Sequence, residues 1–231
     1  MTSKDEITND LTRFFHFLTG FSKKGKLDEL YMSPTQIKPK ILSLIHNETR
    51  KAEDGQIIAK VNSLVDEDVI RALYKASQAG VKIDLIVRGI CCLKPSIEGV
   101  SENIRVISIL GKYLEHPRVF YFKNDSAKIY ISSADWMPRN LVRRIELLTA
   151  IKDEESQNQI IQILKLQCSD NVLAHELQRD GSYIKVKAKE DEKPTNNHKL
   201  LEEYVNKISK ASKKETQRSV SQITSKLFME S

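Results

Sequence analysis

Aromatic residues are scarce in this sequence, and their scarcity excludes one class of binding protein. They make up 6% of the 231 residues, with a single tryptophan, and no stretch interleaves them with lysine or arginine. Proteins that bind single-stranded nucleic acid stack the bases on such side chains along a basic groove. Although the chain carries a net charge of +6, we therefore expect no nucleic acid among its partners.

Cysteine is also rare. Only Cys91, Cys92 and Cys168 are present, which is too few and too irregularly spaced for a disulfide framework or a metal site. We expect buried, reduced thiols, as in a cytoplasmic protein. No leader with a charged and then an apolar part follows Met1, and no apolar run approaches the length of a membrane span. Both observations also favour the cytoplasm.

Length and patterning predict one α/β domain with flanks. At 231 residues and 40% apolar content, the chain can bury one sizeable core. Helical periodicity alternates with short apolar runs that are typical of strands, and this alternation predicts a mixed sheet between helices. Ser33 is expected to cap a helix with Pro34 at its first position. The expected helices are 7–19, 34–52, 66–79 and 154–167, and the expected strands are 30–32, 57–64, 81–88, 104–110, 116–122, 128–132 and 145–151.

His116 and Arg118 lie two residues apart at the start of an expected strand, so their side chains should point to the same face. Imidazole exchanges protons near neutral pH, and guanidinium binds charged oxygens in a bidentate way. The pair therefore suits a phosphoryl group, although an ordinary hydrogen-bonded surface pair has the same pattern. The next strand, reached through a turn at 124–126, should return the end at Ser132–Asp135 beside His116.

Arg88 ends an expected buried strand. Five of the seven residues from Val81 to Val87 are apolar, which is typical of a parallel strand with a helix on each face. Gly89 allows the chain to turn at once, and open α/β sheets bind their ligands at the carboxyl ends of their strands. An arginine at this position is poorly explained by packing, and we expect it to contact an anionic ligand.

Six segments, in a fixed order, carry a family signature. They are Leu30–Pro34, Lys60–Asp66, Leu85–Cys91, Tyr113–His116, Ser132–Met137, and Arg139–Asn140 with Arg144–Glu146. From about residue 7 to about residue 170, the sequence closely resembles the carboxy-terminal part of bacterial polyphosphate kinases, which polymerise the terminal phosphate of ATP. The resemblance implies a phospholipase D-like α/β fold for 30–180, a remnant of a preceding phospholipase D-like domain at 1–29, and a basic, partly helical or disordered tail at 181–231.

The resemblance also implies roles for individual residues. It places Arg88, His116 and Arg144 at the ATP- and phosphate-binding site, with His116 as a supporting acid or base and not as the phosphate acceptor. The acceptor histidine and the surroundings of the Mg²⁺ cofactor belong to family regions without a counterpart here, so we expect a fragment that is inactive alone. The implied partners are ATP or ADP and inorganic polyphosphate. The resemblance further implies a homo-oligomer and leaves membrane association open.

An alternative function is a free-standing phospholipase D-like phosphodiesterase that pairs two His116 motifs in a dimer. The phospholipase D signature is a His-x-Lys pair, an acid and a Gly-Ser-x-Asn-like turn. The corresponding places here read His116, Arg118, Lys123 and Ser132–Asp135. The lysine has become arginine and the acid has become lysine, which argues against hydrolysis.

Both flanks have a distinct character. The helix expected at 7–19 carries Leu11, Phe14, Phe15 and Leu18 on one side. It should pack against a preceding domain and, without one, promote self-association. From Gly181 onward, 11 Lys and Arg face 7 Asp and Glu, so this stretch either guides polyphosphate to the site or is simply solvated. Within it, 198–208 has helical spacing.

Overall fold

The computed structural model of the chain describes residues 4–22, 25–207 and 209–210. Within these residues, one sheet has the strand order β1-β7-β6-β5-β2-β3-β4-β8-β9. The strands are β1 (Leu30–Met32), β2 (Gln56–Val61), β3 (Lys82–Val87), β4 (Ile104–Ile109), β5 (Arg118–Phe122), β6 (Ile129–Ser132), β7 (Leu147–Ile151), β8 (Ala174–Leu177) and β9 (Tyr183–Lys185). The helices are α1 (Asp5–Leu18), α2 (Ile37–Thr49), α3 (Glu67–Gln78) and α4 (Glu154–Cys168), followed by a helical stretch at 197–207.

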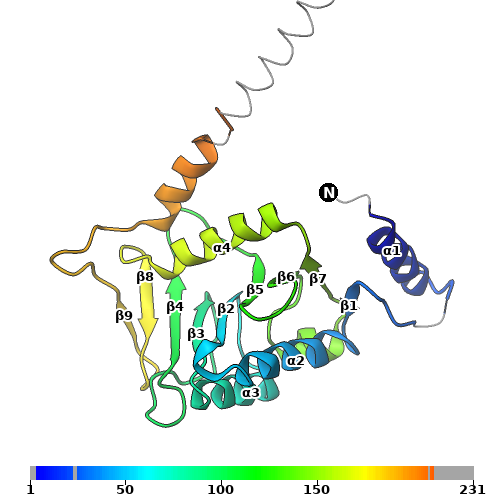
Figure 1. Ribbon diagram of the computed structural model, residues 1–231, viewed down its shortest axis with the longest axis horizontal. Helices are drawn as coiled ribbons and strands as arrows, with labels where there is room; N and C mark the ends of the chain where they lie inside the picture. The colour runs from blue at the N-terminus through cyan, green and yellow to red at the C-terminus, as the bar shows by residue number, and fades with distance from the viewer. Residues whose placement is uncertain (1–3, 23–24, 208, 211–231) are drawn as a thin grey trace, which may run out of the picture.

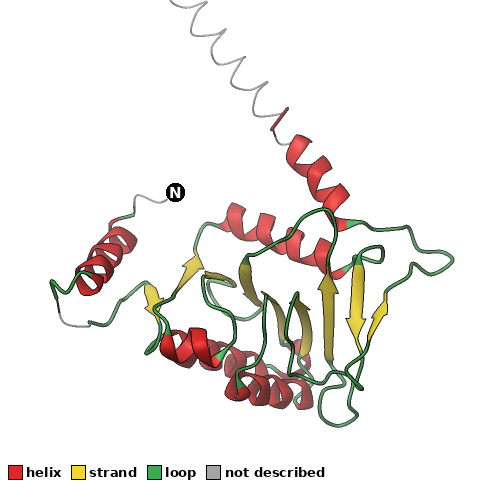
Figure 2. Ribbon diagram, turned by 180° about the vertical axis from the view of Figure 1, so that it is seen from behind, coloured by secondary structure: helices red, strands yellow, loops and turns green. Residues whose placement is uncertain are grey.

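The sheet lies between two layers of helices, as predicted. Helices α2 and α3 cover one face and α4 covers the other (Figure 1; Figure 2 shows the reverse side). Strands β2, β3 and β4 are parallel, and all other pairings are antiparallel. In β2, Ile57 and Ala59 pack in the core with α2 and α3, whereas Ile58 packs in the core with α4. Burial on both faces explains the nearly continuous apolar runs of the central strands.

Helix α2 begins later than predicted, and Ser33 does not cap it. The helix starts at Ile37 after a turn in which the Gln36 amide donates to the Met32 carbonyl, 2.7 Å away. Ser33 is buried, and its hydroxyl lies 2.6 Å from the carbonyl oxygen of Asn140 and also contacts that of Arg144. This serine therefore satisfies carbonyl groups far along the chain instead of helix amides. By contrast, Asp66 caps α3 as expected, accepting a hydrogen bond from the Val69 amide.

The sheet continues beyond residue 180, where composition suggested only a tail. Strands β8 and β9 pair with each other, and β8 also pairs with β4. Both are short and partly polar, so they give no alternating or apolar signal that sequence patterning can detect. The helix expected at 198–208 is present at 197–207, whereas 208 and 211–231 lie outside the described residues.

The three cysteines are free thiols, but only two are shielded from solvent. Burial raises the pKa of the Cys91 thiol to about 11 and that of the Cys168 thiol to about 12. Both therefore stay protonated and unreactive at neutral pH. Cys92 is exposed, so the expectation of buried thiols is wrong for this residue.

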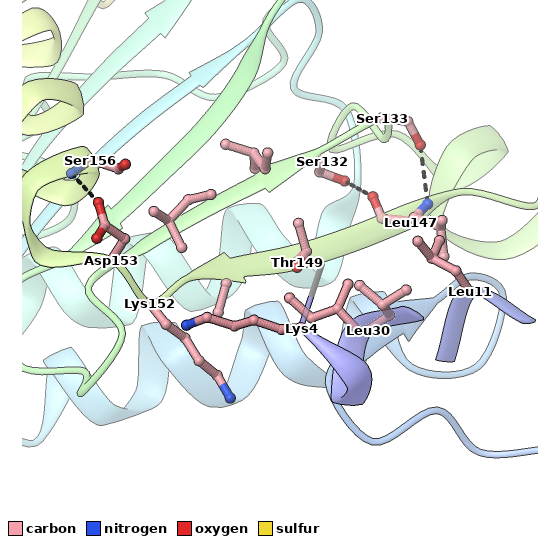
Figure 3. A pocket seen from close by; sticks show the side chains of 14 residues that line it. Lys4, Leu11, Leu30, Ser132, Ser133, Leu147, Thr149, Lys152, Asp153 and Ser156 are labelled. Atoms are coloured by element: carbon pink, nitrogen blue, oxygen red, sulfur yellow. Dashed lines mark hydrogen bonds between the residues drawn. The ribbon is translucent and has the colours of Figure 1, made fainter. Parts of the chain in front are cut away.

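Helix α1 lies at one edge of the sheet, beside β1 (Figure 1). The buried Asp10 carboxylate accepts hydrogen bonds from the successive amides of Asp28, Glu29 and Leu30, at 2.8, 2.6 and 3.0 Å. Phe14 packs with Leu30 in a small apolar cluster. An open groove of about 730 Å³ separates α1 from β6 and β7, and Figure 3 shows the lining side chains. Helix α1 is thus fixed at β1 without closing over the sheet.

Part of the apolar surface of α1 stays exposed, as expected, although Phe14 is covered. Phe15 is 58% exposed, Leu18 43%, and Phe21, just after the helix, 86%. Burial of such a side chain contributes about 1.5 to 3 kcal/mol, so this surface should drive association. We expect the chain to self-associate at micromolar concentration, and the triple variant F15S/L18S/F21S to sediment as a monomer.

The matched control for this variant is Val205→Ser, which removes a side chain that is 60% exposed elsewhere. This control should sediment like the parent chain. A parent chain that is already monomeric would show that the exposed side chains do not associate.

Candidate functional site

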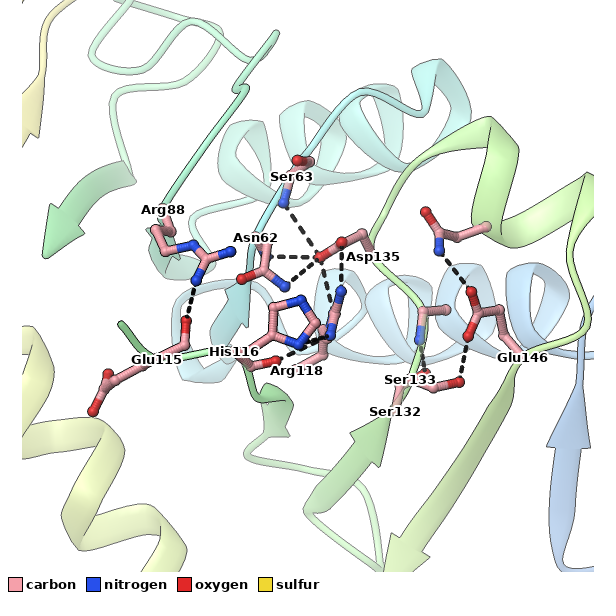
Figure 4. Close-up of polar contacts among 12 residues, drawn as sticks. Asn62, Ser63, Arg88, Glu115, His116, Arg118, Ser132, Ser133, Asp135 and Glu146 are labelled. Atoms are coloured by element: carbon pink, nitrogen blue, oxygen red, sulfur yellow. Dashed lines mark hydrogen bonds and ion pairs between the residues drawn. The ribbon is translucent and has the colours of Figure 1, made fainter. Parts of the chain in front are cut away.

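Polar and charged side chains gather at one end of the sheet (Figure 4). Asn62 follows β2, Arg88 follows β3, His116 lies just before β5, and Asp135 follows β6. Strand β5 runs antiparallel to β2 and β6, so its start lies beside the ends of those two strands. The predicted return of the end of β6 to the neighbourhood of His116 is therefore confirmed.

His116 and Arg118 are in direct contact. Nη1 of Arg118 lies 2.8 Å from Nδ1 of His116 and donates to the His116 carbonyl oxygen at 3.0 Å. Guanidinium donates hydrogen bonds and does not accept them, so Nδ1 of His116 must be the acceptor. In neutral imidazole the proton then resides on Nε2. Nε2 can donate to a phosphate oxygen, but it has no free lone pair with which to attack phosphorus.

Arg118 itself is not available for a ligand, contrary to the interpretation of the His-x-Arg pair as a joint phosphate site. Its Nε and Nη2 donate to the two carboxylate oxygens of Asp135 at 3.2 and 2.9 Å. The side chains are only 11% and 10% exposed. Arg118 therefore orients His116 and joins it to Asp135. An isolated sequence motif could not reveal this pairing, because it depends on how the ends of β5 and β6 meet.

Asp135 connects three strand ends. Its Oδ1 accepts from the backbone amides of Asn62, at 2.7 Å, and Ser63, at 3.3 Å, and from the Asn62 side chain at 3.3 Å. Burial raises the pKa of Asp135, but the hydrogen bonds from Arg118 and from these amides outweigh that effect, so the pKa lies below its ordinary value. The carboxylate is charged at neutral pH and holds the ends of β2, β5 and β6 together.

Arg88 lies beside this cluster and is half-buried. Its Nη1 donates to the carbonyl oxygen of Glu115 at 2.8 Å, and it forms no ion pair with a carboxylate within the described residues. The following Gly89 has its amide 2.7 Å from the Asn62 carbonyl oxygen, and a Cβ there would lie 2.9 Å from that oxygen. The close approach of two backbone segments thus requires glycine after Arg88, whereas the sequence analysis explained Gly89 by a turn of the chain.

Two charged residues near the site were given no role in the sequence analysis. Lys60, on β2, is buried and forms an ion pair with Glu115, which also accepts a hydrogen bond from Gln167 at 3.0 Å. Burial lowers the pKa of Lys60, and the Glu115 carboxylate opposes this only in part. The sequence signal that could have revealed a role for Lys60 was the presence of a lysine inside the apolar strand expected at 57–64.

Arg144 does not contact the other two predicted site residues. It is exposed, directly follows the π-helical turn Arg139–Arg143 and precedes β7. Because β7 is antiparallel to β6, Arg144 lies at the same end of the sheet as His116. Its side chain forms no ion pair within the described residues. The structure thus brings Arg88 next to the His116 backbone and leaves Arg144 apart.

Two other parts of the phospholipase D pattern have structural roles instead. Lys123 lies at the far end of β5, where it pairs with Asp54 at 2.7 Å, so it is remote from His116. The Ser132 hydroxyl donates to the Leu147 carbonyl oxygen at 2.8 Å, and the Ser133 hydroxyl donates to Glu146. Both serines therefore hold β6 against the start of β7.

The fold and this cluster define an α/β domain with a mixed sheet between two layers of helices and a histidine and an arginine at one end of that sheet. Residues 30–198 match the family model for polyphosphate kinase C-terminal domain 2. The sequence is 58% identical to polyphosphate kinase of Campylobacter jejuni subsp. doylei over 230 residues, 99% of this chain and 33% of the relative. It is 50% identical to that of Helicobacter pylori over 202 residues, 87% of this chain and 29% of the relative.

A solved structure agrees with these sequence comparisons. The crystal structure of polyphosphate kinase from Porphyromonas gingivalis matches with a TM-score of 0.86 and 37% sequence identity. The match covers 91% of this chain and 33% of that one. This chain belongs to the polyphosphate kinase family and spans about a third of the length of these relatives.

Proposed function

We propose that this chain provides the ATP- and polyphosphate-binding residues of a polyphosphate kinase. In this proposal Arg88, His116 and Arg144 bind phosphate during reversible transfer of the terminal phosphate of ATP to polyphosphate. The intermediate phosphohistidine forms on a residue outside this chain. The observation that carries the proposal is the contact of Arg118 with Nδ1 of His116, which leaves Nε2 as a proton donor, together with Arg88, which binds the adjacent Glu115 carbonyl oxygen and meets no carboxylate within the described residues.

The chemistry of phosphoryl transfer suits these groups. Its transition state is loose and spreads negative charge over the phosphate oxygens, so catalysis depends mainly on positioning and charge stabilisation. Arg88 supplies a permanent positive charge, and His116 supplies a proton donor at a defined atom. Arg144, exposed at the same end of the sheet, adds a second cation that a long anionic chain can reach.

Other expectations remain part of the proposal. Within the described residues no cluster of three or more His, Cys, Asp and Glu side chains could hold a metal ion, and Mg²⁺ is proposed from the family alone. In the same part of the chain, no helix has the length and apolar character that a membrane crossing requires. A cytoplasmic location, ATP or ADP and polyphosphate as partners, and a homo-oligomer are proposed from the family.

The chain alone should form no phosphohistidine. Because Arg118 donates to Nδ1 of His116, neutral Nε2 carries a proton and is a poor nucleophile. Incubation with ATP labelled at its terminal phosphate should therefore give no acid-labile label, either in the parent chain or in His116→Ala. His175→Ala, on β8, is the matched control. Stoichiometric labelling that only His116→Ala abolishes would make His116 the phosphate acceptor and contradict the proposal.

The phosphodiesterase alternative is tested with the same proteins. Hydrolysis of bis(4-nitrophenyl) phosphate, lost in His116→Ala, would support it. We expect no hydrolysis, because Lys123 occupies the place of the acid in the signature and lies at the far end of β5.

A further inference from the structure

The residues before His116 have no regular secondary structure of their own. Residues 111–116, here called the His116 loop, connect β4 to β5, and none of them belongs to a helix or strand. Two of their side chains are largely in solvent: Tyr113 is 45% exposed and Leu114 75%. The loop must nevertheless place His116 and the Glu115 carbonyl oxygen, which contacts Arg88. Its conformation therefore depends on contacts with other segments.

The start of the 197–207 helix is held firmly against the end of α4. Asp170 is buried, and its Oδ2 accepts from the backbone amide and the side chain of Asn197 at 2.8 and 2.6 Å. Its Oδ1 accepts from the amides of Val172, Leu173 and Ala174. The Asp170 carboxylate thus connects the start of this helix to the start of β8. We call residues 197–202 the tail strap.

The tail strap contacts the His116 loop through a buried histidine. His198 is 3% exposed, its Nδ1 accepts from the Tyr113 amide at 3.4 Å, and its ring lies 5.3 Å from the Tyr113 ring. A Cβ at Gly111 would lie 3.0 Å from Nδ1 of His198 and 2.8 Å from a methyl group of Leu173. The loop backbone at Gly111 therefore lies so close to His198 that a larger side chain at this position would collide with the ring.

A second contact lies one helical turn further along the tail strap. Oε1 of Glu202 accepts from Nζ of Lys112 at 2.5 Å and from the Tyr113 hydroxyl. These hydrogen bonds lower the pKa of Glu202, so its carboxylate is charged at neutral pH. Because this pair is exposed, it adds less than the buried histidine does. Together the two contacts fix the first half of the loop.

Glu115 carries the connection to the site. Its carboxylate pairs with Lys60 and accepts from Gln167, and its Oε1 lies 3.9 Å from Nε2 of His198. Nδ1 of His198 accepts a hydrogen bond, so its proton is on Nε2 and faces this carboxylate. That distance is too long for a hydrogen bond, and the attraction is electrostatic. Glu115, which directly precedes His116, therefore has contacts with β2, α4 and the tail strap.

We propose that the tail strap positions the His116 loop, with His198 as its positioning residue. The tail strap fixes the conformation of the His116 loop. This conformation in turn determines where His116 and the Glu115 carbonyl oxygen lie in the site. His198 acts through the loop and contacts no substrate. The basic region after 181 thus supplies, at its helical part, a structural support for the site. The effect on phosphate binding rests on the function proposed above, whereas the effect on the loop does not.

Hydrogen–deuterium exchange of this chain tests the proposal, with His198→Ala, His198→Asn and Glu203→Gln compared with the parent. Loss of about one hydrogen bond should speed exchange of the Tyr113 amide roughly tenfold in His198→Ala. Asn presents an oxygen near the place of Nδ1, so His198→Asn should restore much of the protection. Glu203 is exposed on the same helix, and Glu203→Gln should exchange like the parent. Calorimetric titration with a short polyphosphate should show weaker binding in His198→Ala alone.

Two results would overturn the proposal. One is unchanged exchange throughout the His116 loop in His198→Ala. The other is faster exchange in the loop and in β2 to the same extent, which would show that His198 serves only global stability. A third result would separate the two proposals. If loop exchange is faster in His198→Ala, but polyphosphate binding is unchanged both in His198→Ala and in Arg88→Ala, the positioning role of the tail strap stands and the proposed function is overturned.

Discussion

Arg88→Ala should weaken the binding of a short polyphosphate to this chain about 10- to 100-fold, because a hydrogen bond to a charged group contributes about 1.5 to 3 kcal/mol. Arg88 is half-buried, and within the described residues its guanidinium meets only a carbonyl oxygen. A cation in that setting gains more from an anionic ligand than one already paired with a carboxylate. In a full-length family member, the same substitution should remove about 2 to 4 kcal/mol of transition-state stabilisation.

Isothermal titration calorimetry at two salt concentrations measures the effect, since an open anionic contact weakens as salt rises. Arg71→Ala is the matched control, because Arg71 is an exposed arginine on α3 whose nearest carboxylate is Glu67 at 3.5 Å. It should leave binding unchanged. Arg144→Ala should add to the loss seen in Arg88→Ala. If the double variant binds as the parent does, the basic residues after 181 bind the polyphosphate and the proposed site does not.

Asp135→Asn should cost about 3 kcal/mol of unfolding free energy at neutral pH, because breaking a buried ion pair leaves the other charge without compensation. Asn keeps one oxygen, which can still accept from the amides of Asn62 and Ser63, but its NH2 group would then face Nη2 of Arg118, so the bidentate ion pair is lost. His116 should also become less ordered, since Arg118 fixes its ring. Urea unfolding measures the stability, and the NMR signals of the His116 ring report its order.

The pH dependence of stability gives a second readout of this variant. The pKa of Asp135 is lowered in the folded chain, so its contribution is present above the pKa of about 3.9 of an unfolded aspartate and is lost as pH falls through the folded value. Asp135→Asn should therefore be less sensitive to acid than the parent. Asp54→Asn, which removes an exposed partner of Lys123, should change stability little. Equal losses in both variants would contradict a special role for Asp135.

Much of the fold follows from the sequence because its central strands are strongly patterned. The buried run before Arg88 and the cap at Asp66 are local signals, and both features are present in the structure. The convergence of His116 with the end of β6 was also predictable, because a hairpin joins neighbours in sequence. The late start of α2 was missed, since the Ser33 hydroxyl contacts carbonyl groups more than 100 positions away.

The partners of the site residues were harder to predict than the residues themselves. The sequence indicated Arg118 as a ligand for phosphate, yet Asp135 binds it. Whether an arginine meets a carboxylate or a ligand depends on how two strand ends face each other, and periodicity carries no information on that. The same limit applies to Lys123, whose spacing matches a signature while its position at the far end of β5 does not.

The pairing of β2 with β5 has a consequence for how the chain folds. Between these neighbouring strands the chain builds α3, β3 and β4, and the Asn62 amide meets Asp135 across 73 positions of sequence. Such distant pairings require closure of a long loop before any contact compensates the lost entropy, which makes them slow to form. The geometry around His116 should therefore be among the last features to appear during refolding. Recovery of polyphosphate binding would then report the completed sheet and would lag behind the recovery of helical circular dichroism.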